Sequence, residues 1–136
     1  MKSQLHYVRF VRWFDEIGLD DLDLVGGKNA SLGELAGSFG DSIKVPEGFA
    51  ITSEAYRRMV DSGGLWQRMM KILDATNWRD PKATGPASVK LRKLIRNAPL
   101  PDGLITDIEI AYRRLERDFG RGVAVAVRSS ATAEDS

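Results

Sequence analysis

Apolar residues recur at helical spacing along much of the chain. The clearest stripe runs from Leu104 to Phe119, where apolar residues lie three or four positions apart. The same spacing predicts helices over Leu65–Ala75, over 87–97, and from Thr52 or Ser53 to Asp61. Because 77–86 contains two prolines and a glycine, that segment is predicted to be a loop.

A further helix is predicted to follow a glycine-rich turn and to end near Phe39. Asn29 or Ser31 is expected to cap its N-terminus, and Ser31 followed by Glu34 has the spacing of a capping box. Its inward face is expected to carry Leu32, Leu35, Ala36 and Phe39.

β-Branched and aromatic residues predict strands at Tyr7–Phe14, Phe49–Thr52 and Val123–Arg128. Valine and alanine alternate from Val123 to Val127, so the bulky side chains share one face and the small ones share the other face with Arg128. The pattern therefore predicts an α/β (α+β) fold, in which a small sheet holds these three segments and several helices pack on the valine face.

Composition excludes several classes of protein. The net charge is +1 and the basic residues of helix 87–97 lack interleaved aromatics, so nucleic-acid binding is not expected. No apolar run has the length of a membrane span, and no apolar signal region follows Met1. There is no cysteine, which fits a cytoplasmic protein and excludes thiolate chemistry, and the single histidine, His6, has no metal-ligating cluster near it.

The sequence Gly26-Gly27-Lys28 is the first candidate for chemistry. Glycines let a backbone approach a ligand closely, and a lysine beside a helix N-terminus suits a phosphate group. The spacing is neither that of a Walker A loop nor that of a dinucleotide-binding fingerprint. On these residues alone, a plain glycine turn leading into a helix remains an equal alternative.

The second candidate is the segment after Val127, where Arg128 is followed by hydroxyl and acidic residues. Its hydroxyls suit phosphate oxygens or a metal-bound water, and its acids suit a metal site, whereas the alternative is a simple cap and turn with solvated acids. We expect Lys28 and Arg128 to meet at one site, because ligands of open α/β sheets bind beyond the carboxyl ends of strands and near helix N-termini. Two cations placed there repel each other unless an anion lies between them. The alternative is that each pairs separately, for instance Arg128 with Glu134 or Asp135.

Three motifs in this order, residues 25–34, 45–56 and 126–135, closely resemble the N-terminal part of the phosphoenolpyruvate synthase family. Its wider group includes pyruvate phosphate dikinase and rifampicin phosphotransferase. The resemblance implies an ATP-grasp-like N-terminal nucleotide-binding subdomain, with residues 1–136 as its incomplete first piece. It also implies an enzyme that converts ATP, pyruvate and water to phosphoenolpyruvate, AMP and phosphate through a phosphohistidine on a separate swivelling domain.

The same resemblance implies that Lys28 and Arg128 contact the phosphates of ATP. The predicted ATP-binding residues are Gly26, Gly27, Lys28, Arg128, Ser129 and Thr132. No catalytic residue and no metal ligand is predicted here, since the ligands of Mg²⁺ lie mostly in later parts of the family's proteins. His6 does not match the family's phosphohistidine.

Two alternatives to a synthase stay open at this point. One is the ATP-binding end of a rifampicin-type antibiotic phosphotransferase, and the other is a standalone, non-catalytic nucleotide-binding module. In either enzyme, the isolated chain is expected to be inactive, and pyruvate would bind only to absent domains. Oligomer formation by the full-length protein is left open.

Overall fold

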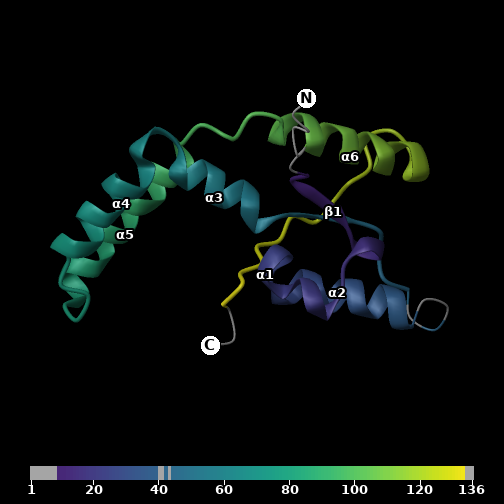
Figure 1. The fold of residues 1–136 in the computed structure, drawn as a ribbon, viewed down its shortest axis with the longest axis horizontal. Helices are drawn as coiled ribbons and strands as arrows, with labels where there is room; N and C mark the ends of the chain where they lie inside the picture. The colour runs from purple at the N-terminus through teal and green to yellow at the C-terminus, as the bar shows by residue number, and fades with distance from the viewer. Residues whose placement is uncertain (1–8, 40–41, 43, 134–136) are drawn as a thin grey trace, which may run out of the picture. The chain divides into compact units, whose positions relative to one another are not determined.

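The structure, a computed structural model, describes residues 9–39, 42 and 44–133. These residues fall into two compact units (Figure 1). The first contains the described residues up to Ala55 and those from Gly103 onward, and the second contains Tyr56–Asp102. Each unit has its own helices and its own apolar core.

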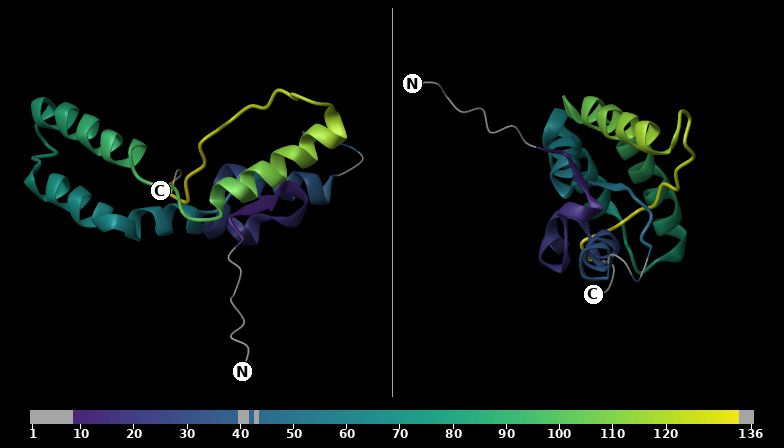
Figure 2. Two further views of the ribbon diagram at one scale, coloured as in Figure 1. Left: turned by 90° about the horizontal axis from the view of Figure 1, so that it is seen from above. Right: turned by 90° about the vertical axis from the view of Figure 1, so that its right-hand side faces the viewer.

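The first unit is built on a small antiparallel sheet. Strand β1 (Val11–Trp13) pairs with β2 (Phe49–Ile51), and Trp13 lies opposite Phe49. The Trp13 and Phe49 rings meet edge to face at 5.5 Å between centroids, the preferred arrangement of an aromatic pair. Helix α6 (Leu104–Phe119) lies alongside β1 and buries Ala111 and Leu115 against Val11 and Trp13 (Figure 2).

The other side of this unit holds the glycine-rich helix. Two 3₁₀ turns, η1 (Phe14–Glu16) and η2 (Leu19–Asp21), lead through the short helix α1 (Leu22–Val25) into α2 (Gly27–Ser38). A second cluster of buried residues holds these elements together: Ile17, Val25, Ala30 and Ala50. Gly33 permits close packing here, because a Cβ atom on it would lie 2.3 Å from the carbonyl oxygen of Ile17.

Helix α3 (Ser53–Asp61) begins in the first unit and continues into the second. The turn η3 (Ser62–Gly64) separates it from α4 (Leu65–Ala75), and α5 (Pro81–Arg96) packs on α4. The core of the second unit is formed by Met59, Val60, Leu65 and Met69, packed against Leu91, Leu94 and Ile95.

The mixed α/β class is confirmed, and so are the helices at Ser53–Asp61, Leu65–Ala75 and Leu104–Phe119. Amphipathic spacing identified them because each buries one apolar stripe. Of the first predicted strand, the described part is paired at Val11–Trp13, whereas residues 7 and 8 lie outside the described residues.

The predicted strand at Val123–Arg128 is wrong. The segment forms no ladder with any described strand, and Val127 is 92% exposed. A strand requires a hydrogen-bonded neighbour, and none of the described segments takes that position. Only Val123 packs on the core beside α6, where its carbonyl oxygen accepts a 2.8 Å hydrogen bond from the Tyr112 hydroxyl. The three-stranded sheet with helices on the valine face is therefore not formed.

Two helix boundaries also differ from the predictions. Helix α5 begins at Pro81, inside the predicted loop, because the Asp80 carboxylate caps it by accepting the Lys82 N–H at 2.9 Å, and proline suits the first helical position. Helix α2 begins at Gly27, so Asn29 and Ser31 both lie inside it, and neither the predicted caps nor the predicted capping box is formed.

The inward face of α2 was also predicted wrongly in part. Its fully buried positions are Ala30 and Gly33, whereas Phe39 is 50% exposed. The small residues are buried because α2 lies too close to Ile17 for larger side chains at these positions. Leu32, Leu35 and Ala36 are half-buried.

Candidate functional site

The glycine-lysine motif forms the joint between α1 and α2. Gly26 is buried and has φ 79° and ψ 161°, a conformation that side-chain-bearing residues rarely adopt. Its N–H donates to the Leu22 carbonyl at 2.8 Å, and its own carbonyl accepts the Ala30 N–H at 3.0 Å. Gly26 therefore ends one helix and begins the next, with both backbone groups satisfied.

The hydroxyl-rich segment near the end of the chain lies against this joint. The Gly27 N–H donates to the Ala131 carbonyl at 3.3 Å. A Cβ atom built on Gly26 would lie 2.4 Å from Ser130 Oγ and 2.9 Å from the Ala131 oxygen. Figure 1 shows the yellow end of the described chain passing beside α1. The structure thus brings together the two motifs that the sequence analysis selected.

The predicted phosphate-binding residues are neighbours of this contact in sequence. Lys28 follows Gly27 on α2, Arg128 precedes Ser129 and Ser130, and both cationic residues are exposed. Ser129 and Thr132 are also exposed, next to the Ser130–Ala131 contact in sequence. Arg128 forms no ion pair with the residues that the structure describes, and its suggested partners Glu134 and Asp135 lie outside them.

Sequence reasoning missed the role of Ser130 and Ala131, which provide the contact itself. Ser130 Oγ is buried and has no hydrogen-bond partner among residues 9–39, 42 and 44–133. A glycine pair before a lysine suggested a backbone that a ligand could approach closely. In the structure, the N–H groups of both glycines donate to protein carbonyls. The motif spacing contains no signal for this pairing, because it depends on how distant segments pack.

An acidic depression is lined by residues of η1 and η2. Its volume is about 470 Å³, and the acids that line it are Asp15, Glu16, Asp20, Asp21 and Glu34. Such a surface repels the phosphates of a nucleotide. Within the described ranges, no group of three or more His, Cys, Asp or Glu residues is arranged to hold a metal ion.

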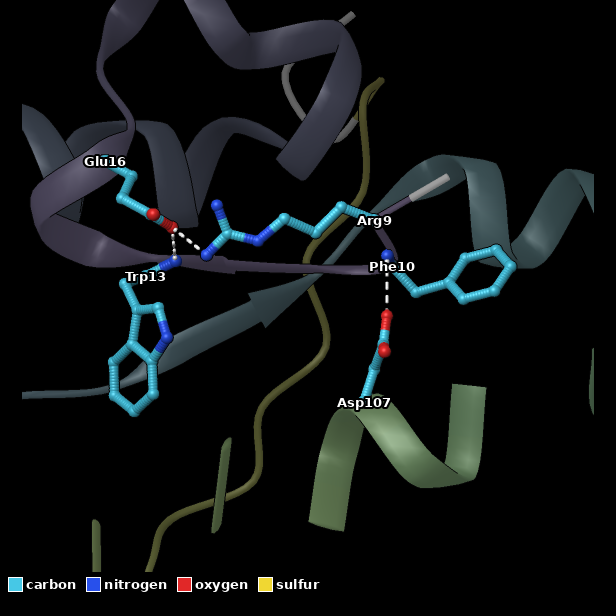
Figure 3. A network of polar contacts seen from close by, with 5 residues as sticks. All are labelled: Arg9, Phe10, Trp13, Glu16 and Asp107. Carbon is cyan, nitrogen blue, oxygen red and sulfur yellow. Dashed lines mark hydrogen bonds and ion pairs between the residues drawn. The ribbon is translucent and has the colours of Figure 1, made fainter. Parts of the chain in front are cut away.

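The pKa of Glu16 is lowered, and the cause is structural. Partial burial raises the pKa of Glu16. Hydrogen bonds from the Trp13 N–H and the Arg9 guanidinium, together with the charges of Arg9 and Arg12, lower it by more, so the pKa lies below its usual value. Both hydrogen bonds are 2.8 Å long (Figure 3). Since the network fixes the turn after β1, it supports the fold rather than the candidate site.

Comparison with known proteins identifies the family of the chain. Residues 22–136 match the family model described as "Pyruvate phosphate dikinase, AMP/ATP-binding domain". The chain is 40% identical over 130 residues to a probable phosphoenolpyruvate synthase of Staphylothermus marinus, covering 93% of this chain and 15% of the relative. It is 42% identical over 129 residues to a probable phosphoenolpyruvate synthase of Methanocaldococcus jannaschii, covering 94% of this chain and 11% of the relative.

The phosphoenolpyruvate synthase of Escherichia coli is 40% identical over 126 residues, with 92% of this chain and 16% of the relative covered. The chain thus spans between 11% and 16% of the length of these relatives. The helices of the described residues include none that is both long and apolar enough to cross a membrane. With most of its length matched by the domain model, the chain belongs to the pyruvate phosphate dikinase AMP/ATP-binding domain family.

Proposed function

We propose that this chain is the N-terminal, phosphate-binding piece of the ATP site of a phosphoenolpyruvate synthase. The whole enzyme would convert ATP, pyruvate and water to phosphoenolpyruvate, AMP and phosphate. The observation that carries the proposal is the contact of Gly26–Gly27 with Ser130–Ala131, because it draws the lysine-bearing and arginine-bearing motifs toward one place. The similarity to synthases across more than nine-tenths of the chain supports the same activity.

In this site, Lys28 and Arg128 would hold the phosphates of ATP. A guanidinium can grip phosphate oxygens with two parallel hydrogen bonds, and an ammonium adds a compact positive charge. Ser129 and Thr132 would donate hydroxyl hydrogen bonds to the same oxygens, while Gly26 and Gly27 shape the backbone beside them. Phosphoryl transfer depends mainly on positioning and charge stabilisation, which are the contributions these residues offer.

Magnesium would enter this site with the nucleotide. Because no group of three or more potential ligands is assembled among the described residues, the metal would be held by the phosphates and by residues elsewhere in the enzyme. The phosphate-accepting histidine and the pyruvate site would also belong to other domains. A cytoplasmic enzyme accords with the cysteine-free sequence.

The test is an ATP titration of the full-length protein carrying Lys28→Ala, Arg128→Ala or both. Each single substitution is expected to weaken ATP binding by about 1.5–3 kcal/mol, because a charge-assisted hydrogen bond to phosphate is lost. If both side chains bind the same phosphates, their effects should not be additive: the loss of ATP-binding free energy in the double variant should differ from the sum of the losses in the two single variants.

Lys90→Ala is the matched control, since Lys90 is an exposed lysine on α5 in the second unit. It should leave ATP binding unchanged. Unaltered nucleotide affinity and turnover in both Lys28→Ala and Arg128→Ala would remove the proposed phosphate site.

A further inference from the structure

The joint between α1 and α2 has almost no space for a side chain at Gly26. A Cβ atom there would approach Ser130 Oγ to 2.4 Å and the Ala131 oxygen to 2.9 Å, both shorter than non-bonded contacts allow. The backbone around the joint is held in place by buried Val25 and Ala30, which are 4% and 0% exposed. Since α2 cannot retreat without opening this cluster, a side chain at Gly26 would displace Ser130 and Ala131 instead.

Gly26 also has no free backbone donor to offer a phosphate. Its N–H, the one backbone group that could donate to a phosphate oxygen, is already bonded to the Leu22 carbonyl. What the glycine does provide is a bare Cα against which the buried Ser130 hydroxyl rests. The geometry points to a contact between protein segments rather than between protein and nucleotide.

We propose that Gly26 is a positioning residue that seats Ser130–Ala131 on the α1–α2 joint and so sets the separation of Lys28 and Arg128 around a nucleoside triphosphate. The inference rests on the proposed ATP site. Lys28 lies two residues after Gly26, and Arg128 lies two residues before Ser130. Two residues span at most about 7 Å, so a shift at the joint is passed to both cations.

The experiment compares Gly26→Ala with wild type in the full-length protein, with ATP as the varied substrate. Misplacing the groups that position a substrate by about 1 Å lowers the efficiency of an enzyme by as much as roughly 100-fold. For displaced ATP-binding groups, we expect KM for ATP to rise at least about tenfold. KM for pyruvate should stay unchanged, because the contact lies in the nucleotide-binding piece. The thermal shift produced by ATP alone, which needs no turnover, should fall in parallel.

Two further variants separate positioning from general damage. Ser130→Val enlarges the other side of the same contact without straining the Gly26 backbone, and it should raise KM for ATP while leaving KM for pyruvate unchanged. Gly37→Ala lies on the same helix with nothing within 4 Å of the added Cβ, and its KM values should match wild type. If Gly26→Ala does not fold, Ser130→Val still decides the question.

The outcomes distinguish this inference from the function on which it rests. If Lys28→Ala and Arg128→Ala weaken ATP binding but Gly26→Ala and Ser130→Val bind ATP as wild type does, the positioning role is wrong and the phosphate site stands. If none of the four substitutions affects ATP binding, the proposed function itself falls. Equal rises in KM for ATP and for pyruvate would also overturn the positioning role.

Discussion

The Asp107 carboxylate accepts a 3.1 Å hydrogen bond from the backbone N–H of Phe10, 97 positions earlier in the chain (Figure 3). Both residues are buried, at 8% and 3% exposure. The bond therefore fastens the start of α6 to the residue that precedes β1. Buried backbone donors rarely lack an acceptor, so this side chain has a structural role that its charge in the sequence did not reveal.

Asp107→Ala should destabilise the first unit. It leaves the buried Phe10 N–H without this acceptor, which costs about 1–3 kcal/mol. Urea denaturation of the 136-residue chain measures the change in the free energy of unfolding. Asp107→Asn, which keeps an acceptor oxygen at nearly the same place, should lose less, and equal losses in the two variants would contradict the role given to this bond.

Two glycines on α2 should respond in opposite ways to alanine. Gly33→Ala places a methyl group 2.3 Å from the Ile17 oxygen, and overpacking of this kind destabilises by about 1–3 kcal/mol. Gly37→Ala meets no atom within 4 Å and should stabilise the helix by about 0.5–1 kcal/mol. Thermal melting of the two variants side by side makes the comparison. A Gly33→Ala protein as stable as Gly37→Ala would show that α2 does not pack closely on Ile17.

Glu16 should make a small contribution to stability that depends on pH. Because its pKa in the folded chain lies below the usual value of 4.5, the contribution is present above that value and is lost as the pH falls through the lowered pKa. At neutral pH, Glu16→Gln should reduce stability by no more than about 1 kcal/mol, since the pair with Arg9 is partly exposed.

The measurement for Glu16 is the free energy of unfolding of wild type and Glu16→Gln at neutral pH and at a pH well below 4.5. The difference between the two proteins should shrink at the acidic pH. A difference that grows on acidification would reverse the sign argued here.

The 136-residue chain alone should form no phosphoenolpyruvate from ATP, magnesium and pyruvate. Phosphoryl transfer needs bound metal and an acceptor, and the proposed function places both in other parts of the enzyme. The assay compares the chain with the full-length protein and with a sample that contains no protein. Product above the sample without protein would mean that catalytic groups lie within these residues.

Most helices could be predicted from the sequence because their packing is local. In α4 and α6, an apolar stripe at helical spacing is bounded by glycines with positive φ at Gly64 and Gly103. The spacing of apolar residues and the helix-ending glycines together determine where such helices lie, with little contribution from distant residues. Helix α5 shows the limit, since Pro86 predicted a loop yet lies inside a helix that Asp80 caps and that α4 supports by packing.

Features that depend on distant segments could not be predicted in the same way. Val123–Val127 has the composition of a buried strand, but pairing is a property of two segments, and the composition of one segment does not specify its neighbour. For the candidate site, the sequence identified both motifs, yet it did not indicate that Ser130 would occupy the space beside Gly26. The roles of Lys28 and Arg128 toward ATP stay a prediction.

Ala55 and Leu104 share one buried cluster with Phe10, so the chain leaves the first unit and re-enters it at neighbouring points. The second unit is therefore an insertion whose ends are already held together. Loop-closure entropy grows only with the logarithm of length, so doubling an insertion adds only about 0.6 kcal/mol. The length of residues 56–102 can therefore change at little cost in closure entropy, while the segments that carry Lys28 and Arg128 both stay within the first unit.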